Sequence, residues 1–405
     1  RRPALLALGA AATLPFRIPI ESGGDTANLL VPLYLVIGAG ALAYAVPRLR
    51  DGGAPEAPVR ERGWLEWLLA GALVLYAAQA AYSSDFDRAL AQVVFFYVPF
   101  ALLFALLVRI RWSTRLAGWC LAVMVALAAV FVGIGFWEYE QRQLLLNPRV
   151  ISSNQFESYF RVNSLFFDPN IYGRFLVVVM LGIVALLLWS RRAGTVAGCV
   201  LALVLLWAGL VLTLSQSSFT ALLVGLAVLG ALRWGLRRAA AAAAAFAVAG
   251  VVVVLAAPGA VGLDQSADAA TSGRSELVTG GIELFTDRPV QGWGAGAFRR
   301  EYRRQEKASS ARAAAASHTI PVTVAAEQGA GGLLLYLALA FVAIATLAAG
   351  LRSRAHRSVA RAGVAAGFVA VVVHTLLYAA FLEDPLTWAL LAAGVGLAGG
   401  TDDGA

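Results

Sequence analysis

Three histidines are the simplest acid–base groups in the sequence. His318 stands in the polar run Ser317-His318-Thr319, His356 lies among arginines, and His374 lies within an apolar run. An imidazole has a pKa of about 6.5 and can accept a proton at neutral pH. His318 alone combines a polar setting with a place beside an apolar segment. We therefore select it as the candidate catalytic histidine and expect His374 to be a packed, hydrogen-bonded core residue.

Arginines beside polar turns form the second group. Arg161 and Arg174 flank the turn signal at residues 168–170, and Arg274 precedes an amphipathic pattern. A guanidinium fork suits the oxygens of phosphate groups. Arg174 falls one turn into an apolar helix, where a charge either has a partner or function, or extends to the membrane interface. The sequence leaves both alternatives open.

The helices that position these histidines and arginines are predicted to lie in a membrane. Of the 405 residues, 60% are apolar and only 14% are charged, whereas a soluble domain has about 25% charged residues. The sequence therefore predicts an all-α polytopic membrane protein. Its formal net charge of +8 reports membrane topology rather than a nucleic-acid partner.

A transmembrane helix needs about 20 mostly apolar residues. We expect the first of the predicted helices to be retained rather than cleaved as a signal peptide. Twelve segments qualify, of which the first, eighth and twelfth are short or weak: Pro3–Ile18, Ala27–Val46, Trp64–Tyr82, Ala89–Val108, Leu116–Trp137, Ile171–Trp189, Val196–Leu214, Phe219–Leu232, Ala239–Ala257, Ile320–Ala349, Val359–Phe381 and Leu386–Leu397.

The loop charges predict how these helices are oriented. Arginines fill every second loop, and the alternate loops contain acidic residues such as Glu21 and Asp85. This positive-inside pattern predicts that both termini are cytoplasmic. The two long loops, Glu138–Asn170 and Pro258–Thr319, then lie on the outer face, which disfavours an enzyme driven by cytoplasmic nucleotides. The chain divides into helices 1–9 at residues 1–257 with the outer loop 138–170, a large extracytoplasmic loop at 258–319, and helices 10–12 at 320–405.

The larger loop has its own patterns. An amphipathic helix begins near Ser272 and ends by Asp287. The glycines from 292 to 296 predict a tight backbone turn rather than a dinucleotide fingerprint. The basic stretch Arg299–Lys307 has helical spacing, which is typical of a solvated or headgroup-contacting face, with substrate contact as the alternative.

Three other polar patterns remain. The first has two open interpretations, the second is better explained as a helix cap, and the third is a pair of loop charges. The turn Thr213–Ser218 precedes an apolar run too short to span, so either the turn is embedded or the helix begins earlier. The sequence Asp85-Phe86-Asp87 matches a metal-holding D-x-D pair, but a helix N-cap is the better interpretation. Glu383 with Asp384 is interpreted as a pair of loop charges.

No Cys/His metal set, Walker motif or G-x-S-x-G nucleophile motif occurs, so the sequence predicts no metal and no cofactor. Nine residues separate His318 from Glu327. This spacing is half a turn out of phase on a helix, so Glu327 is not expected to be the direct partner of His318 unless the helix breaks.

Taken in order, these motifs resemble the O-antigen ligase and O-antigen polymerase superfamily. The matching segments are Arg161–Arg174, Thr213–Ala221, Gly273–Phe298 and Ser317–Gly332. Together they are fairly specific for the superfamily, but they do not separate ligase from polymerase. The resemblance implies the fold of a C-type membrane glycosyltransferase, with about twelve helices and a large outer loop that contains helices.

The resemblance also implies an activity and a location. This activity is transfer of a glycan from an undecaprenyl-pyrophosphate carrier to a glycan or lipid-glycan acceptor hydroxyl, without a metal, at the outer face of the bacterial cytoplasmic membrane. The family's loop histidine corresponds to His318, which would act as the base, and its loop arginine corresponds to Arg274. Membrane lipids would surround the carrier's tail.

One position departs from the family pattern. Ser218 stands where the family has an arginine in its T-x-S-R-G turn. The resemblance therefore implies that Arg161 or Arg174 supplies the missing charge for pyrophosphate, or that the donor is held differently. Ser218 itself, Asn170 and Glu327 are weaker candidates for substrate contact.

Two alternatives remain beside an O-antigen ligase-like enzyme. A polymerase of the same superfamily would use the same donor and elongate its own product. A non-enzymatic membrane transporter belongs to another class, but transporters usually show inverted repeats or charges deep in the bundle, and no convincing repeat is found here.

Overall fold

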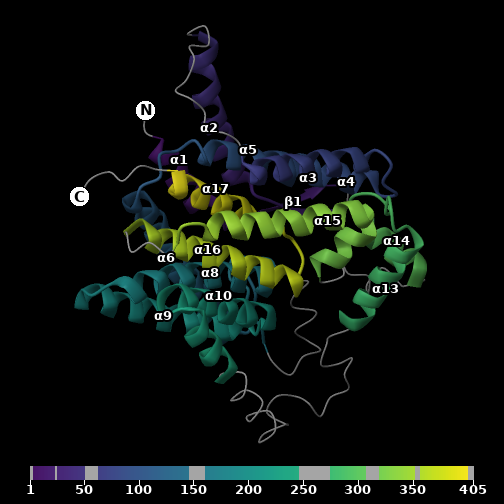
Figure 1. Ribbon diagram of the computed structural model, residues 1–405. Coiled ribbons are helices and arrows are strands. Elements are labelled where there is room, and N and C mark those ends of the chain that lie inside the picture. The colour runs from purple at the N-terminus through teal and green to yellow at the C-terminus, as the bar shows by residue number, and fades with distance from the viewer. Residues whose placement is uncertain are drawn as a thin grey trace, which may run out of the picture.

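A computed structural model of the protein describes residues 3–22, 25–50, 63–145, 160–245, 274–306, 319–351 and 356–399. Most of these residues form helices that pack side by side in a bundle (Figure 1). In chain order the elements are α1 (Ala4–Thr13), β1 (Ile18–Ser22), β2 (Asp25–Leu29), α2 (Val31–Arg50), α3 (Trp64–Ala80), α4 (Phe86–Gln92), the π-helical segment η1 (Val93–Tyr97), α5 (Val98–Leu107), α6 (Thr114–Gln141), α8 (Pro169–Trp189), α9 (Ala193–Thr213), α10 (Gln216–Trp234), α13 (Arg274–Asp287), α14 (Phe298–Glu306), α15 (Ile320–Ala348), α16 (His356–Leu376) and α17 (Pro385–Gly399).

The apolar helices make the chain a multi-pass membrane protein. Among the described residues, eight helices are long and apolar enough to cross a bilayer: Val31–Arg50, Phe86–Leu107, Thr114–Gln141, Pro169–Trp189, Ala193–Thr213, Gln216–Trp234, Ile320–Ala348 and Val359–Leu376. Three shorter apolar helices are α1, α3 and α17. Eleven of the twelve predicted segments thus coincide with a described apolar helix. The ninth, Ala239–Ala257, lies mostly outside the described residues, and the count of twelve stays a prediction.

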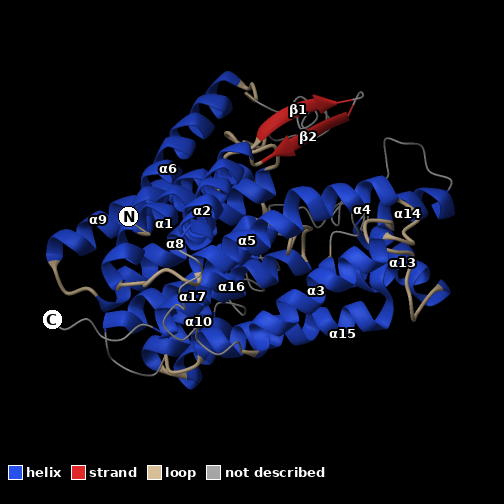
Figure 2. Ribbon diagram, turned by 90° about the horizontal axis from the view of Figure 1, so that it is seen from above, coloured by secondary structure: helices blue, strands red, loops and turns tan. Residues whose placement is uncertain are grey.

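The helical class predicted for the chain is confirmed for the bundle, and the described residues also contain one β-hairpin near the N-terminus that the sequence does not predict. Strands β1 and β2 pair antiparallel, with Ile18 opposite Leu29 and Ser22 opposite Asp25. Figure 2 shows this hairpin beside the helix bundle. Helix α1 consequently ends at Thr13, which makes it too short to span a bilayer alone.

Helix α8 is the centre of the bundle. In its candidate span 72% of the residues are buried, against 11–56% in the other seven. It packs against α16, α10, α9 and α6. Gly173 allows a close approach of α10, because a Cβ at this position would collide with Ser218 at the start of α10. The polar start of α8 is therefore held directly against the turn between α9 and α10.

One end of the bundle carries most of the polar structure. Helices α4, α13 and α14 lie together at this end, whereas α1 begins and α17 ends toward the other (Figures 1 and 2). The start of α8, the α9–α10 turn and the loop before α17 lie together, because hydrogen bonds described below connect them, and residues 381–383 of that loop line a cavity with the first half of α15. The arrangement agrees with the predicted outer side, which itself stays a prediction.

Candidate functional site

A buried polar network joins four segments: the start of α8, the α9–α10 turn, the end of α16 and the loop that leads into α17. Buried polar groups need hydrogen-bond partners, so each of these side chains must be satisfied from within the network. Its fully buried members, each at most 6% exposed, are Asn170, Arg174, Thr213, Ser215, Ser217, Ser218, His374 and Asp384.

Arg174 is tied to the loop before α17. Its Nη1 forms an ion pair with Asp384 Oδ2 at 2.5 Å and also donates to the Ala380 carbonyl at 2.8 Å. Nη2 donates to the Ala379 carbonyl at 2.7 Å. The side chain is buried, so the alternative in which it extends to the interface is wrong. Contact between Arg174 and a phosphate stays a prediction, and the structure shows that its guanidinium already links two segments.

His374 is a hydrogen-bonded core residue, as the sequence predicts, and the network fixes its protonation. Arg174 Nε lies 3.2 Å from His374 Nδ1. A guanidinium can only donate, so Nδ1 must be the acceptor and the imidazole is neutral with its proton on Nε2. Nε2 lies 3.1 Å from Ser217 Oγ and 3.2 Å from Ser218 Oγ. His374 therefore connects Arg174 of α8 to Ser217 and Ser218 at the start of α10 through hydrogen bonds.

The network continues through serines to Arg161. Ser218 Oγ lies 2.8 Å from Ser215 Oγ, and Ser215 Oγ donates to Asn170 Oδ1 at 2.8 Å. The same Asn170 oxygen accepts from Arg161 Nη2 at 3.2 Å, while Arg161 Nε donates to the Thr213 carbonyl at 2.9 Å. Arg161 is only partly buried. Its guanidinium is thus held at the α9–α10 turn by Thr213 and Asn170.

The start of α8 is capped by an acid that also contacts the loop after α16. Asp168 Oδ1 accepts from Asn170 N at 2.6 Å, which caps the helix. Its second oxygen accepts from the Tyr378 hydroxyl at 2.6 Å. Burial and the neighbouring Asp168 carboxylate raise the pKa of Tyr378, so this phenol remains a donor at neutral pH. Asp168 therefore joins the start of α8 to the loop after α16, as Arg174 also does.

Helix α15 breaks where it meets the glycine turn. Gly329 has a φ of 67° within α15. The Gly294 amide donates to the Glu327 carbonyl at 2.8 Å, and the Phe298 amide donates to Glu327 Oε1 at 3.1 Å. Gly292 also has a positive φ of 65°, and a Cβ there would collide with the Glu327 carbonyl. The tight turn predicted for this segment is confirmed, and Glu327 holds it against α15.

The amphipathic helix predicted near Ser272 is α13, which begins at Arg274. It packs on α15 through Leu277 and Leu284, which cluster with Phe298. The side chain of Arg274 lies outside the described residues, and so does His318. Their predicted roles are therefore untested, although the helix that begins at Arg274 and the helix that follows His318 are in contact.

The basic stretch forms α14, and it has the character of a surface helix. Arg300 and Arg304 are exposed, and Arg300 donates to the Ser84 carbonyl. The Ser83 hydroxyl in turn donates to the Ala295 carbonyl at 2.7 Å. The sequence favours a helix N-cap over a metal-binding pair for Asp85. Asp85 does occupy the N-cap position of α4, but its side chain makes no capping hydrogen bond. The segment at residues 295–300 is thus fastened to the connection between α3 and α4.

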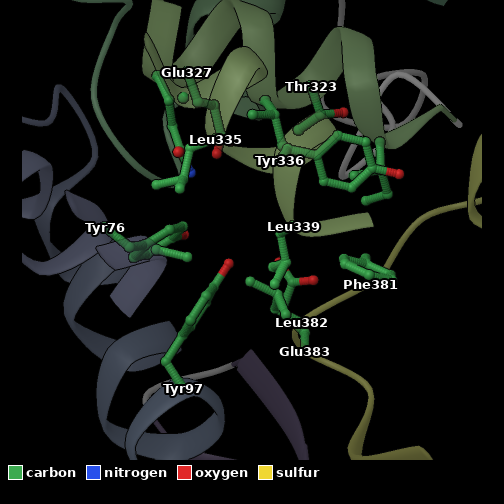
Figure 3. Close-up of a pocket in the computed structure, with 15 residues that line it drawn as sticks. Tyr76, Tyr97, Thr323, Glu327, Leu335, Tyr336, Leu339, Phe381, Leu382 and Glu383 are labelled. Atoms are coloured by element: carbon green, nitrogen blue, oxygen red, sulfur yellow. The ribbon is translucent and has the colours of Figure 1, made fainter. Parts of the chain in front are cut away.

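A cavity lies between α3, η1, the first half of α15 and the loop at 381–383. Figure 3 shows tyrosines and carboxylates around it. The rings of Tyr76 and Tyr97 stack with centroids 4.2 Å apart. Glu327 and Glu383 also line the cavity. Burial raises the pKa of Glu383, and Arg88 opposes this effect.

Sequence reasoning missed part of this site. Glu383 and Asp384 are interpreted there as ordinary loop charges, yet Asp384 is buried in an ion pair and Glu383 lines the cavity. The only sequence signal is that two acids precede the helix breaker Pro385 beside an apolar helix. Among the described residues, no group of three or more His, Cys, Asp or Glu side chains could hold a metal. Metal independence of the reaction stays a prediction.

Residues 201–337 match the family model described as O-antigen ligase. This stretch runs from α9 into α15 and includes the α9–α10 turn, α13, the glycine turn and Glu327. No curated protein matches the chain. The match supports a function of the O-antigen ligase or polymerase type, with lipid-linked glycans and a membrane as its setting. Residues 201–337 are thus similar to an O-antigen ligase domain, and the resemblance to the O-antigen ligase superfamily is confirmed.

Proposed function

We propose that this protein transfers a glycan from undecaprenyl-pyrophosphate to an acceptor hydroxyl at the outer face of the bacterial cytoplasmic membrane. It would do so as a glycosyltransferase of the O-antigen ligase type. The observation that carries the proposal is the O-antigen ligase match at residues 201–337. That single stretch contains the Thr213–Ser218 turn, Arg274, His318 and Glu327.

Arg161 supports the proposal at the position where the chain departs from the family pattern. The resemblance expects an arginine in the turn where Ser218 stands. Arg161 Nε and Nη2 are hydrogen-bonded to Thr213 and Asn170, which holds a guanidinium at this turn. We assign Arg161, together with Arg274, to the donor's pyrophosphate. Arg174 is a positioning residue and does not contact the donor, because its ion pair with Asp384 holds α8 against the loop before α17.

The proposed reaction is a single displacement at the anomeric carbon of the donor sugar. The acceptor oxygen bonds to this carbon, and the bond from the carbon to the phosphate oxygen breaks. Undecaprenyl-pyrophosphate leaves with the electron pair, and His318 takes the proton of the acceptor hydroxyl. Guanidinium groups stabilise the negative charge that grows on the leaving phosphates. A neutral imidazole suits the base at pH 7.

The test is a transfer assay with the purified chain, a defined undecaprenyl-pyrophosphate-linked glycan and several glycan acceptors. We expect one addition to a distinct acceptor, which is a ligase product. A ladder of products would place the activity with a polymerase of the same superfamily. Binding of the donor without its consumption by any acceptor would overturn the proposal in favour of a transporter.

A further inference from the structure

The cavity lined by Tyr76, Tyr97, Glu327 and Glu383 has no basic side chain among its described lining residues, and its chemistry points away from pyrophosphate. We propose that it is the subsite for the sugar residue that carries the acceptor hydroxyl. This inference rests on the proposed function and adds the place and the chemical class of the acceptor.

The groups on the cavity wall match those of a sugar. Carboxylate and phenol oxygens can accept hydrogen bonds from sugar hydroxyls. The apolar part of the wall, which includes Leu335, Leu339 and Phe381, can cover the C–H faces of a pyranose ring. An apolar pocket with a few convergent polar groups is the usual form of a small-ligand site.

The sign of the charge separates this cavity from the donor site. Glu327 and Glu383 are two acids on one cavity wall, and among the described residues no arginine or lysine lines the cavity to bind a pyrophosphate. Arg161 and Arg174 belong to the polar network instead. A neutral, hydroxyl-rich ligand suits the first environment, and an anionic donor suits the second.

One loop lies between the two environments. The carbonyls of Ala379 and Ala380 and the carboxylate of Asp384 bind Arg174. In the same loop, residues 381–383 line the cavity. A sugar in the cavity would thus sit across this loop from the network that ends at Arg161. Ile320, which also lines the cavity, follows the proposed base His318 by two residues in the sequence.

Part of the cavity wall is held in place without a ligand. Glu327 accepts the Phe298 amide at 3.1 Å, which leaves capacity on the carboxylate for a further hydrogen bond. The Tyr76 hydroxyl donates to Gln92 Oε1, which fixes the ring that stacks on Tyr97. Preorganised groups of this kind lose little entropy when a ligand binds.

The experiment measures steady-state kinetics of the purified full chain with a lipid-linked donor and a synthetic alkyl glycoside as acceptor. We expect Glu383→Gln and Tyr97→Phe to raise the acceptor KM roughly tenfold or more, as removal of a ligand's buried hydrogen bonds does. The donor KM should stay within about twofold. Glu283→Gln, which changes an exposed carboxylate on α13, is the matched control and should alter neither KM. An unchanged acceptor KM, or a raised donor KM, would overturn the assignment.

A second measurement does not depend on transfer. An alkyl glycoside with a photoreactive diazirine should label peptides from α3 and the first half of α15. Excess acceptor glycan should block this labelling, and inorganic pyrophosphate should not. Labelling without transfer by the wild type would refute the proposed function and leave carbohydrate binding intact. Transfer without labelling of these peptides would refute the acceptor subsite alone.

Discussion

Arg174 and Asp384 form an ion pair inside the helix bundle, and each residue depends on the other. A buried charge that loses its partner costs about 3–5 kcal/mol. We therefore expect Asp384→Asn to lower the free energy of unfolding in detergent by about this amount. Asp287→Asn, at an exposed position at the end of α13, should be neutral. The double variant Arg174→Met with Asp384→Asn should be more stable than Asp384→Asn alone. Equal stability of the Asp384→Asn and Asp287→Asn variants would contradict the account.

Glu383 should make the stability depend on pH. Burial raises its pKa, so the folded chain holds this proton more tightly than the unfolded chain, whose glutamate pKa is about 4.3. The resulting stabilisation is complete below the unfolded pKa and is lost as the pH rises through the folded pKa. Arg88 and Arg174 favour the charged form. We expect Glu383→Gln to gain melting temperature relative to wild type as the pH rises from 4 to 8. A difference that shrinks with pH would have the wrong sign.

At the residue scale, the sequence identifies important side chains more reliably than it predicts the residues that they contact. His374 is expected to be a hydrogen-bonded core residue because it lies within an apolar helix. Its partner Arg174 is 200 positions away, and Asp384 is 210 positions from Arg174. Local patterns carry no information about contacts at such separations, so the ion pair emerges only from the packing of α8, α16 and the loop before α17.

At the scale of elements, the break in α15 should be essential. Gly329 has a positive φ, and a Cβ there would meet the Val290 carbonyl. We expect Gly329→Ala to separate α15 from the glycine turn and to cost about 1–3 kcal/mol of unfolding free energy. Gly331 is the matched control, because a Cβ there meets nothing within 4 Å. Thermal unfolding in detergent should show Gly331→Ala unchanged or stabilised, since alanine favours helix. Equal effects of both variants would contradict this role for Gly329.

The sequence predicts elements well where their signals are local. It predicts the amphipathic helix after Ser272 and the glycine turn, and both are present. It leaves open how the short eighth segment, Phe219–Leu232, spans the bilayer. In the structure α10 begins before this segment, at Gln216. It misses the hairpin at residues 18–29, because this stretch joins two apolar helices and was absorbed into their ends.

At the scale of the whole molecule, the account depends on which side α13 occupies. A cysteine-free chain, with Cys120 and Cys199 replaced by alanine, allows single cysteines to be placed in it. We expect a membrane-impermeant maleimide to label Asp287→Cys in intact spheroplasts. Arg192→Cys, at an exposed position where α9 begins, should react only after the membrane is opened. The reverse pattern would place the polar end in the cytoplasm and contradict the charge rule used here.

The composition and loop charges predict a multi-pass bundle, and the structure describes one. The number of spans cannot be settled by hydropathy alone, because α1, α3 and α17 are apolar yet shorter than a bilayer requires. The site itself is predicted only in outline. The resemblance implies His318 and the arginines, whereas the cavity is built from three helical segments and a loop that no motif connects.

The central claim is glycan transfer with His318 as the base. The measurement is the rate of glycan transfer from undecaprenyl-pyrophosphate by purified wild-type and variant chains, together with donor affinity. His318→Ala should reduce transfer at least about 100-fold, as loss of a general base does, with donor affinity retained. Arg274→Ala should weaken donor affinity, and His356→Ala, on the predicted cytoplasmic side, should behave as wild type. Full transfer activity in the His318→Ala chain would contradict the account.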